Sequence, residues 1–374
     1  MLVALTEQNE RFVLRTSTPK AMLKKLRDHH QFYCPQCKEQ VQFKIGSIKI
    51  PHFAHQSNSQ CDMYFSEPES EQHLLGKEQL LQMFSSQGFE VQLESYIPDL
   101  NQRPDLLVNT NSGITYAVEY QCSPLPSERF LLRNKGYKSL QISPIWIFAT
   151  PPNLSSKMGI EKISLNEQLQ QFVVRYHNQD FLMTYHPYSK KFYYFTNLLH
   201  VKGNSFLTKV LSITIDNQKF PFYLPKKLEE SEFLQYYKSY LVTKTQYTKY
   251  RVLISRSGIN DLFLRSIYEL RLSQSNLPLF LGIPLKGNEE LNTFSLEWQT
   301  ALFYFMHLHC IMLHNMNRQA SMHFLKWAKL KITNKTINLV LDYCRILQSL
   351  SIEHVYSPAE ERQLINLLYA QFLA

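Results

Sequence analysis

The residues best suited to chemistry lie within one short stretch of the chain, residues 103–121. Asp105 begins one apolar run, Glu119 and Gln121 end a second, and a cluster of turn-forming residues at 109–113 separates the two. Two strands joined by such a turn form a hairpin, which can bring Asp105 and Glu119 together at its open end. Because neighbouring carboxylates repel each other unless a cation lies between them, the pair predicts a hard divalent cation with oxygen ligands. An edge hairpin with ordinary solvated acids is the competing interpretation.

A second cluster, of cysteine and histidine, lies near the N-terminus. A Cys-x-x-Cys pair with an internal proline directs two thiolates to one point, as tetrahedral zinc requires, and two histidines and a third cysteine follow it. About 60 residues with few large apolar groups fold poorly without such a metal. The competing interpretation is free thiols with histidines that cap a hairpin. The predicted ligands of a structural Zn²⁺ are Cys34, Cys37, His55 and Cys61, with His52 as the alternate.

A helix before the hairpin adds candidate groups. A start signal and leucines at helical spacing predict this helix over residues 66–86. Glu71 and Glu78 are seven residues apart and fall on one side of it. His73 and Lys77 are four apart and share another side. Acids within an apolar stripe are unusual, although an amphipathic helix with Glu and Lys at its solvent margin gives the same pattern.

A basic helix and a buried strand follow the hairpin. The helix is predicted over residues 128–140, and the uniformly apolar run at 145–148 is typical of a strand buried on both faces. With a further strand at 89–93, the order of elements is helix, three strands, helix, strand. The cations of the basic helix are Arg129, Arg133, Lys135 and Lys138.

Composition and charge limit the class of protein. Hydrophobic residues make up 44% of the 374 residues, which excludes a disordered chain. Residues 1–150 hold 15 basic and 15 acidic residues, so the net charge of +9 comes entirely from residues 151–374. A basic half favours a polyanion such as nucleic acid, with a generically basic surface as the alternative. The first residues lack a signal-peptide pattern and the longest apolar run, 300–313, is too short for a bilayer, so we expect a cytoplasmic protein without membrane contact.

The sequence after residue 150 is less specific. Residues 229–251 interleave Tyr and Lys on a predicted helix, a pattern that suits stacking on bases as well as packing of tyrosines against the domain. A proline-containing linker follows residue 150 and predicts a boundary there. The predicted domains are a β-rich zinc module at 1–65, an α/β domain at 66–150, and a basic, aromatic-rich region at 151–374 that is mainly helical after about 228.

The order of elements resembles the PD-(D/E)xK nuclease core, an αβββαβ fold. Pro104-Asp105 and Glu119-x-Gln121 stand on adjacent predicted strands, and the 13 residues between Asp105 and Glu119 fit the spacing of that superfamily. Gln121 replaces its lysine. The resemblance implies that Lys77, one helix earlier, supplies the missing cation from another backbone position.

A more specific set of motifs runs through about residues 1–150: Tyr33-Cys34-Pro35-x-Cys37, His52-Phe53-Ala54-His55, Glu69-Ser-Glu71-x-His73-x-x-x-Lys77, Arg103-Pro-Asp105, Val118-Glu119-Tyr-Gln121-x-Ser123, Arg129, Tyr137 and Ile145-Trp146. In combination they resemble the competence protein CoiA family. The resemblance implies a cytoplasmic protein of naturally competent Gram-positive bacteria that acts on incoming DNA, as single strands or recombination intermediates, with recombination proteins as possible partners.

The implied activity is that of a metal-dependent DNA nuclease. Asp105 and Glu119 would hold Mg²⁺ or Mn²⁺, and Lys77 would stabilise the negative charge that develops on the phosphate. The rival hypothesis is a protein that binds DNA or a recombination partner through a nuclease-like core without cutting, and Gln121 favours it. The expected catalytic group is completed by Gln121, which would position a water, and by Glu71 (or Glu78) and His73. The expected DNA contacts are Arg129, Arg133, Lys135, Lys138 and Tyr137.

Overall fold

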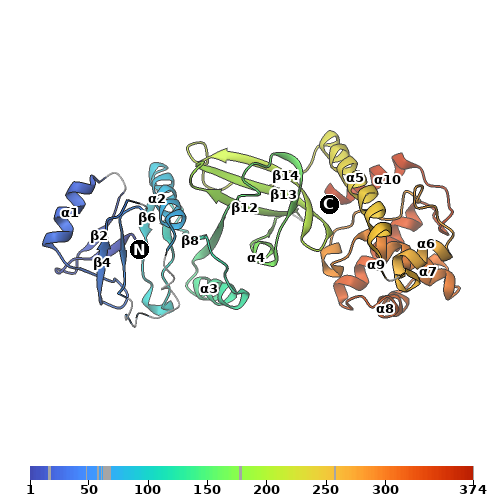
Figure 1. The fold of residues 1–374 in the computed structure, drawn as a ribbon, viewed down its shortest axis with the longest axis horizontal. Helices are drawn as coiled ribbons and strands as arrows, with labels where there is room; N and C mark the ends of the chain where they lie inside the picture. The colour runs from blue at the N-terminus through green and yellow to red at the C-terminus, as the bar shows by residue number, and fades with distance from the viewer. Residues whose placement is uncertain are drawn as a thin grey trace.

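The chain forms an elongated molecule in which three regions follow one another along the long axis (Figure 1). A small β-rich region lies at one end, a long sheet occupies the middle, and a group of helices lies at the other end. This computed structural model describes residues 1–15, 18–47, 49–56, 59, 61, 69–176, 179–256 and 258–373.

The N-terminal region is an antiparallel sheet with strand order β2-β1-β3-β4-β5. Strand β4 alternates buried and exposed residues, with Val41 and Phe43 turned into the core, as expected of a sheet with one face in water. The elements are β1 (Val3–Leu5), β2 (Arg11–Val13), α1 (Lys20–His29), β3 (Phe32–Tyr33), β4 (Gln40–Lys44) and β5 (His52–Ala54).

The middle of the chain has the predicted order of helix, three strands, helix and strand. Strands β6, β7 and β8 pair antiparallel, and β9 lies parallel to β8. The first helix begins at Glu71, because the Ser70 side chain caps it by accepting a hydrogen bond from the backbone N–H of His73; residues 66–68 of the predicted helix lie outside the described residues. The elements are α2 (Glu71–Ser86), β6 (Glu90–Leu93), β7 (Leu106–Asn109), β8 (Thr115–Gln121), α3 (Ser127–Ser139) and β9 (Ser143–Ala149).

The domain boundary predicted at residue 150 falls inside a continuous sheet. Strand β9 pairs in parallel with β12, with Phe148 opposite Thr184 and Ala149 opposite Tyr185. Residues 151–158 are therefore a loop within one layer, and the described strands form a nine-stranded sheet in the order β10-β14-β13-β12-β9-β8-β7-β6, with β11 paired to β12. The added elements are β10 (Gly159–Ser164), α4 (Glu167–Gln170), β11 (Val174–Tyr176), β12 (Gln179–His186), β13 (Lys191–Lys202) and β14 (Ser205–Thr214).

The boundary predicted at residue 65 does not separate two hydrophobic cores. Leu2, Val3 and Phe53 from the N-terminal region share one cluster of buried side chains with Leu74 of α2 and Val118 of β8. Apolar surface that would otherwise face water is buried between the two regions, so the N-terminal region packs as part of the central unit.

The region after residue 228 is helical, as predicted. Tyr236, Tyr237 and Tyr240 of the Tyr–Lys helix are buried in the core of this region, which supports packing over base stacking for these side chains. No described helix combines the length and apolar character needed to cross a membrane. The helices are α5 (Glu230–Ile254), α6 (Leu262–Glu269), α7 (Ser295–Leu308), α8 (Arg318–Trp327), α9 (Asn334–Ser349) and α10 (Glu361–Leu373).

Candidate functional site

The hairpin of β7 and β8 brings the two predicted acids to one cavity. Leu106 pairs with Val118, so Asp105 and Glu119 lie at the same end of the hairpin, and both line a cavity of about 250 Å³ between α2 and α3. The same cavity is lined by His73, Lys77, Gln121, Arg129 and Arg133. Seven of the predicted site residues are therefore assembled from four elements.

Asp105 is fixed by three groups. Its Oδ2 accepts a hydrogen bond from the backbone N–H of Tyr120 (2.8 Å) and lies 3.2 Å from His73 Nε2, while its Oδ1 lies 3.7 Å from Lys77 Nζ. Burial opposes the charged form, but His73, Lys77 and the Tyr120 amide together lower the pKa of Asp105 to about 2. Asp105 is accordingly an ionised oxygen donor across the physiological pH range.

Lys77 reaches this cavity from α2 because the helix packs closely on β8. A Cβ atom at Gly76 would lie 2.1 Å from Cε1 of the Tyr120 ring, so a glycine is what allows this approach. The Lys77 side chain is fully buried, and its ammonium group contacts Glu69 (2.7 Å) and Glu94 in addition to Asp105. Burial disfavours the ammonium, yet these three carboxylates raise the pKa of Lys77 well above its usual range.

Glu71 or Glu78 was expected to add a metal ligand from the helix, but the further carboxylates at the cavity are Glu69 and Glu94, which pair with Lys77. Glu71 does not line the cavity, and Glu78 is buried elsewhere on α2. Glu69 belongs to the Glu69-Ser-Glu71 motif of the family resemblance, so the sequence contained a signal for it. Glu94 follows strand β6 in the left-handed conformation (φ 51°), which is rare for a non-glycine residue, and no sequence signal pointed to it.

Glu119 is held from α3. Arg133 and the Tyr137 hydroxyl both donate hydrogen bonds to its Oε1, and Arg133 also donates to the backbone carbonyl of Arg103 (3.3 Å). Burial raises the pKa of Glu119 more than the Arg133 guanidinium lowers it. The side chain of Tyr137, predicted to contact DNA, is fully buried, and its hydroxyl group donates a hydrogen bond to Glu119 instead of facing the solvent.

Gln121 and Arg129 line the cavity, and the two predicted lysines of α3 do not. The Gln121 side-chain amide donates to the Ser123 carbonyl oxygen (2.7 Å), so its nitrogen is bound within the loop that follows β8. Arg129 lines the cavity, whereas Lys135 and Lys138 are exposed on the outer face of α3.

The four predicted zinc ligands converge in the N-terminal region. The ligand atoms of Cys34, Cys37, His55 and Cys61 all lie within 4.8 Å of one another. Three sulfurs and one imidazole nitrogen at this separation fit tetrahedral zinc. The alternate, His52, is directed away, with its Nδ1 2.9 Å from the Ile50 carbonyl oxygen.

The three thiols of this cluster differ in their electrostatics: the pKa of Cys34 is lowered, whereas burial raises the pKa of Cys37 and of Cys61. Burial opposes ionisation of Cys34, but the hydrogen bond with His55 and the backbone N–H groups of Cys37 and Gln36 lower the pKa of its thiol to about 6. The thiolate is the form that binds metal. The structure therefore supplies a Cys₃His set that could hold zinc.

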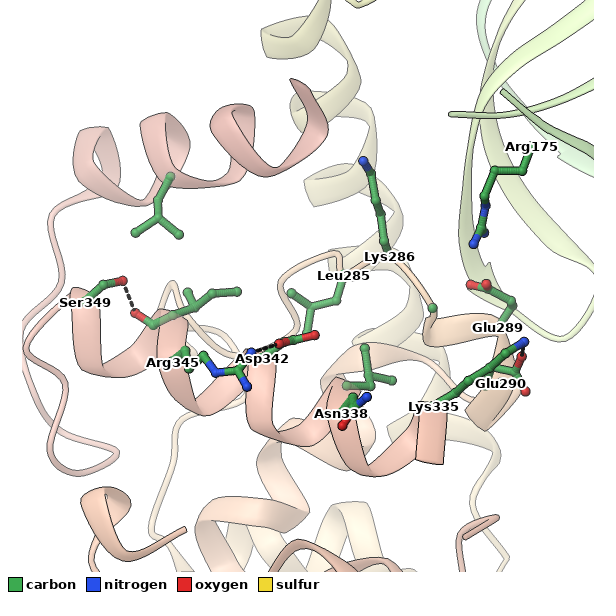
Figure 2. Close-up of a pocket in the computed structure, with 14 residues that line it drawn as sticks. Arg175, Leu285, Lys286, Glu289, Glu290, Lys335, Asn338, Asp342, Arg345 and Ser349 are labelled. Carbon is green, nitrogen blue, oxygen red and sulfur yellow. Dashed lines mark hydrogen bonds and ion pairs between the residues drawn. The ribbon is translucent and has the colours of Figure 1, made fainter. Parts of the chain in front are cut away.

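A larger cavity, of about 820 Å³, lies between the sheet and the C-terminal helices (Figure 2). Several of its cations are paired with carboxylates: Lys335 pairs with Glu290 (2.6 Å), and Arg345 pairs with Asp342 on the same helix. Arg175 forms two hydrogen bonds with Asp180, at 2.7 and 2.8 Å. Because these charges neutralise one another, we assign no reaction to this cavity.

Comparison with known proteins identifies the two N-terminal regions. The model for the competence protein CoiA nuclease-like domain matches residues 69–228, and the model for the competence protein CoiA N-terminal domain matches residues 16–64. The first match extends past residue 150, in agreement with the continuous sheet. Together the two models cover more than half of the chain.

A curated relative supports the same assignment over a shorter range. Competence protein CoiA of Bacillus subtilis (strain 168) is 41% identical over 117 residues, which is 31% of this chain and 31% of that protein. The match thus spans about a third of the relative's length. No solved structure matches the chain. With a CoiA N-terminal domain, a CoiA nuclease-like domain and a cavity lined by the residues of the nuclease-like motifs, the chain belongs to the competence protein CoiA family.

Proposed function

We propose that this protein is a divalent-metal-dependent DNA nuclease that processes internalised DNA in the cytoplasm during natural transformation and recombination. The observation that carries the proposal is the buried ammonium of Lys77, 3.7 Å from Asp105 in a cavity that Glu119 also lines. Gln121 cannot supply a positive charge, and Lys77 supplies one at the same cavity from a different element.

The donor set fits a hard cation. Asp105 and Glu119, with the backbone carbonyl oxygen of Tyr120, would hold Mg²⁺ or Mn²⁺, because these ions prefer oxygen ligands and both carboxylates line the same cavity. When bound, the ion polarises the scissile phosphate and makes a bound water more acidic.

The protein's own groups have distinct tasks in this proposal. His73 orients Asp105 through its 3.2 Å contact, and Arg133 with Tyr137 orients Glu119. Lys77 stabilises negative charge at the phosphate, and it does so without reorganisation because its three carboxylate contacts fix it in advance. Arg129 at the cavity, with Lys135 and Lys138 further along the same helix, would hold the DNA backbone along α3.

Cleavage assays test the proposal. Purified protein is incubated with single-stranded and duplex DNA, with and without Mg²⁺ or Mn²⁺. We expect metal-dependent cleavage that falls on the order of a hundredfold or more in Asp105→Ala and in Glu119→Ala. Glu90→Gln is the control, because the Glu90 carboxylate is exposed at the far end of β6. Cleavage that persists in both alanine variants would remove these residues from the reaction.

The second candidate function is DNA or partner binding without cleavage. It is favoured by the saturation of the key groups: Lys77 already contacts three carboxylates, Glu119 is bound by Arg133, and the Gln121 amide nitrogen is bound by Ser123. This candidate predicts DNA binding that survives Asp105→Ala, with no cleavage of any DNA form by the parent protein.

A further inference from the structure

The buried residue Glu94 contacts three parts of the molecule: the first residues of the chain, helix α2 and the segment before β7. Its Oε1 accepts hydrogen bonds from the backbone N–H of Leu2 (2.9 Å) and from Lys77, and its Oε2 accepts one from the backbone N–H of Val3 (3.2 Å). Its own backbone N–H donates to the carbonyl oxygen of Asp105 (2.8 Å). The side chain is 3% exposed, so protein groups rather than water satisfy its charge.

Strand β1 and Leu2, the residue directly before it, supply two of these donors, and this segment is fixed by the parts of the chain that carry the Cys₃His cluster. Cys34 directly follows β3, which pairs with β1 through Tyr33 opposite Leu5. His55 directly follows β5, and the Phe53 backbone N–H in that strand donates to the Met1 carbonyl oxygen (2.9 Å). Two of the four metal ligands are therefore one strand away from the amides that hold Glu94.

The charges also form a connected group. Glu94 and Glu69 share the ammonium of Lys77, and Lys77 in turn contacts Asp105. Arg103, which lies between the two regions, donates a hydrogen bond to the Met1 sulfur (3.1 Å), and its pKa is raised by Glu94, Glu69 and Cys34 against the effect of burial. If β1 is displaced, the buried Glu94 carboxylate loses two hydrogen-bond donors. Such a loss is destabilising, because a buried charge then lacks partners.

We propose that the Cys₃His module is an integral part of the carboxylate site: metal binding fixes β1, the amides of β1 hold Glu94, and Glu94 positions Lys77 against Asp105. Glu94 is thus a positioning residue whose role depends on a metal cluster in another region. The proposal concerns the organisation of the site and stands whether or not the site cleaves DNA; only its consequence for catalysis rests on the proposed function.

Hydrogen exchange on the full chain tests the coupling. The zinc-loaded protein is compared with protein treated with a zinc chelator, peptide by peptide. We expect loss of protection in the Cys/His segments and also in residues 1–5, 71–77 and 94–105, while helix α7 at 295–308 stays protected. A change confined to residues 31–61 would overturn the proposal, and so would a uniform loss that includes α7, because neither follows the route through Glu94.

Glu94→Gln tests the route itself. Glutamine has one acceptor oxygen instead of two and no charge, so amide exchange at Leu2 and Val3 should rise on the order of tenfold in the zinc-loaded variant. In this variant, removal of zinc should no longer alter exchange in residues 71–77. Glu90→Gln is the matched control at the opposite end of β6, since the exposed Glu90 carboxylate accepts a hydrogen bond from Asn109 only at the surface.

Two further measurements separate positioning from a general loss of structure. Metal analysis should find the same zinc content in Glu94→Gln, Glu90→Gln and the parent, about one per chain. The nuclear magnetic resonance signal of the Lys77 ammonium should shift in Glu94→Gln and stay unchanged in Glu90→Gln. A Glu94→Gln protein with parent-like coupling to zinc would overturn the proposal. If the parent protein shows the coupling but cuts no DNA, the coupling proposal stands and the proposed nuclease activity is rejected.

Discussion

Lys77 Nζ lies 3.7 Å from Asp105 Oδ1, although Lys77 stands on α2 and the PD-(D/E)xK pattern would place its lysine on strand β8, at Gln121. The glycine before Lys77 makes this possible, because the Tyr120 ring occupies the space that a side chain at position 76 would fill. The cation is thus supplied across the contact between helix and sheet.

Replacing Lys77 by methionine should destabilise the protein by about 3–5 kcal/mol, because Glu69, Glu94 and Asp105 would keep their charges without the buried ammonium. The loss should shrink as the pH is lowered from 8 toward 5, since protonation then relieves the repulsion among the carboxylates. Urea unfolding at both pH values measures the effect. Lys135→Met, at an exposed site, is the control. A Lys77→Met protein as stable as the parent at pH 8 would contradict the network.

Asp105 should contribute to the free energy of unfolding of the parent protein, and this contribution should be lost in acid. Its folded pKa of about 2 lies below the ordinary value of 3.8, so the ionised form is favoured by folding and the contribution is complete above about pH 4. The contribution is lost as the pH falls from about 4 to 2 and amounts to roughly 2 kcal/mol. The free energy of unfolding of the parent minus that of Asp105→Asn should therefore decline over this window. Parallel pH curves for the two proteins would contradict the lowered pKa.

The zinc ligands should be distinguishable from the neighbouring histidine. Cys34→Ser/Cys37→Ser and His55→Ala should each lose the metal, since they remove atoms from the cluster. His52→Ala should keep about one zinc per chain, because the His52 ring faces the Ile50 carbonyl group instead. Metal analysis of purified protein measures the content. Zinc loss in His52→Ala together with zinc retention in His55→Ala would reverse the assignment.

Local patterns in the sequence predicted much of this site, and long-range contacts account for what they missed. The 103–121 hairpin and the Cys/His set depend on turns and spacings within a few dozen residues, so both could be inferred. Glu94 could not, because its partners on β1 lie 92 and 91 positions away. The sheet that crosses the boundary expected at residue 150 was missed for the same reason: the parallel pairing of β9 with β12 leaves no mark in the linker between them.

Gly76→Ala should destabilise the protein even though alanine is the better helix former. The new Cβ atom would lie 2.1 Å from the Tyr120 ring, so helix and strand must separate or the ring must move, at a cost of about 1–3 kcal/mol. Thermal unfolding measures the change. Gly46→Ala is the control, because a Cβ atom at that position meets nothing within 4 Å. Equal effects of the two substitutions would contradict the close packing of α2 on β8.

Lys135 and Lys138 should contribute to DNA affinity, whereas Tyr137 between them should not. Both lysines are exposed on α3, and Tyr137 is buried against Glu119. In Lys135→Ala/Lys138→Ala, the affinity for DNA should fall. The negative slope of log affinity against log salt concentration should become shallower by about 1.5, as expected for the loss of two phosphate contacts.

Tyr137→Phe is the matched variant on the same helix, because it removes only the hydroxyl group that donates to Glu119. Its salt slope should equal that of the parent, since no phosphate contact is lost. The free energy of unfolding should fall by about 1–2 kcal/mol, because Glu119 loses a buried hydrogen bond. Fluorescence anisotropy with labelled DNA across a salt series, together with urea unfolding, measures both quantities. A reduced slope in Tyr137→Phe, or an unchanged slope in the double lysine variant, would show that DNA does not follow the outer face of α3.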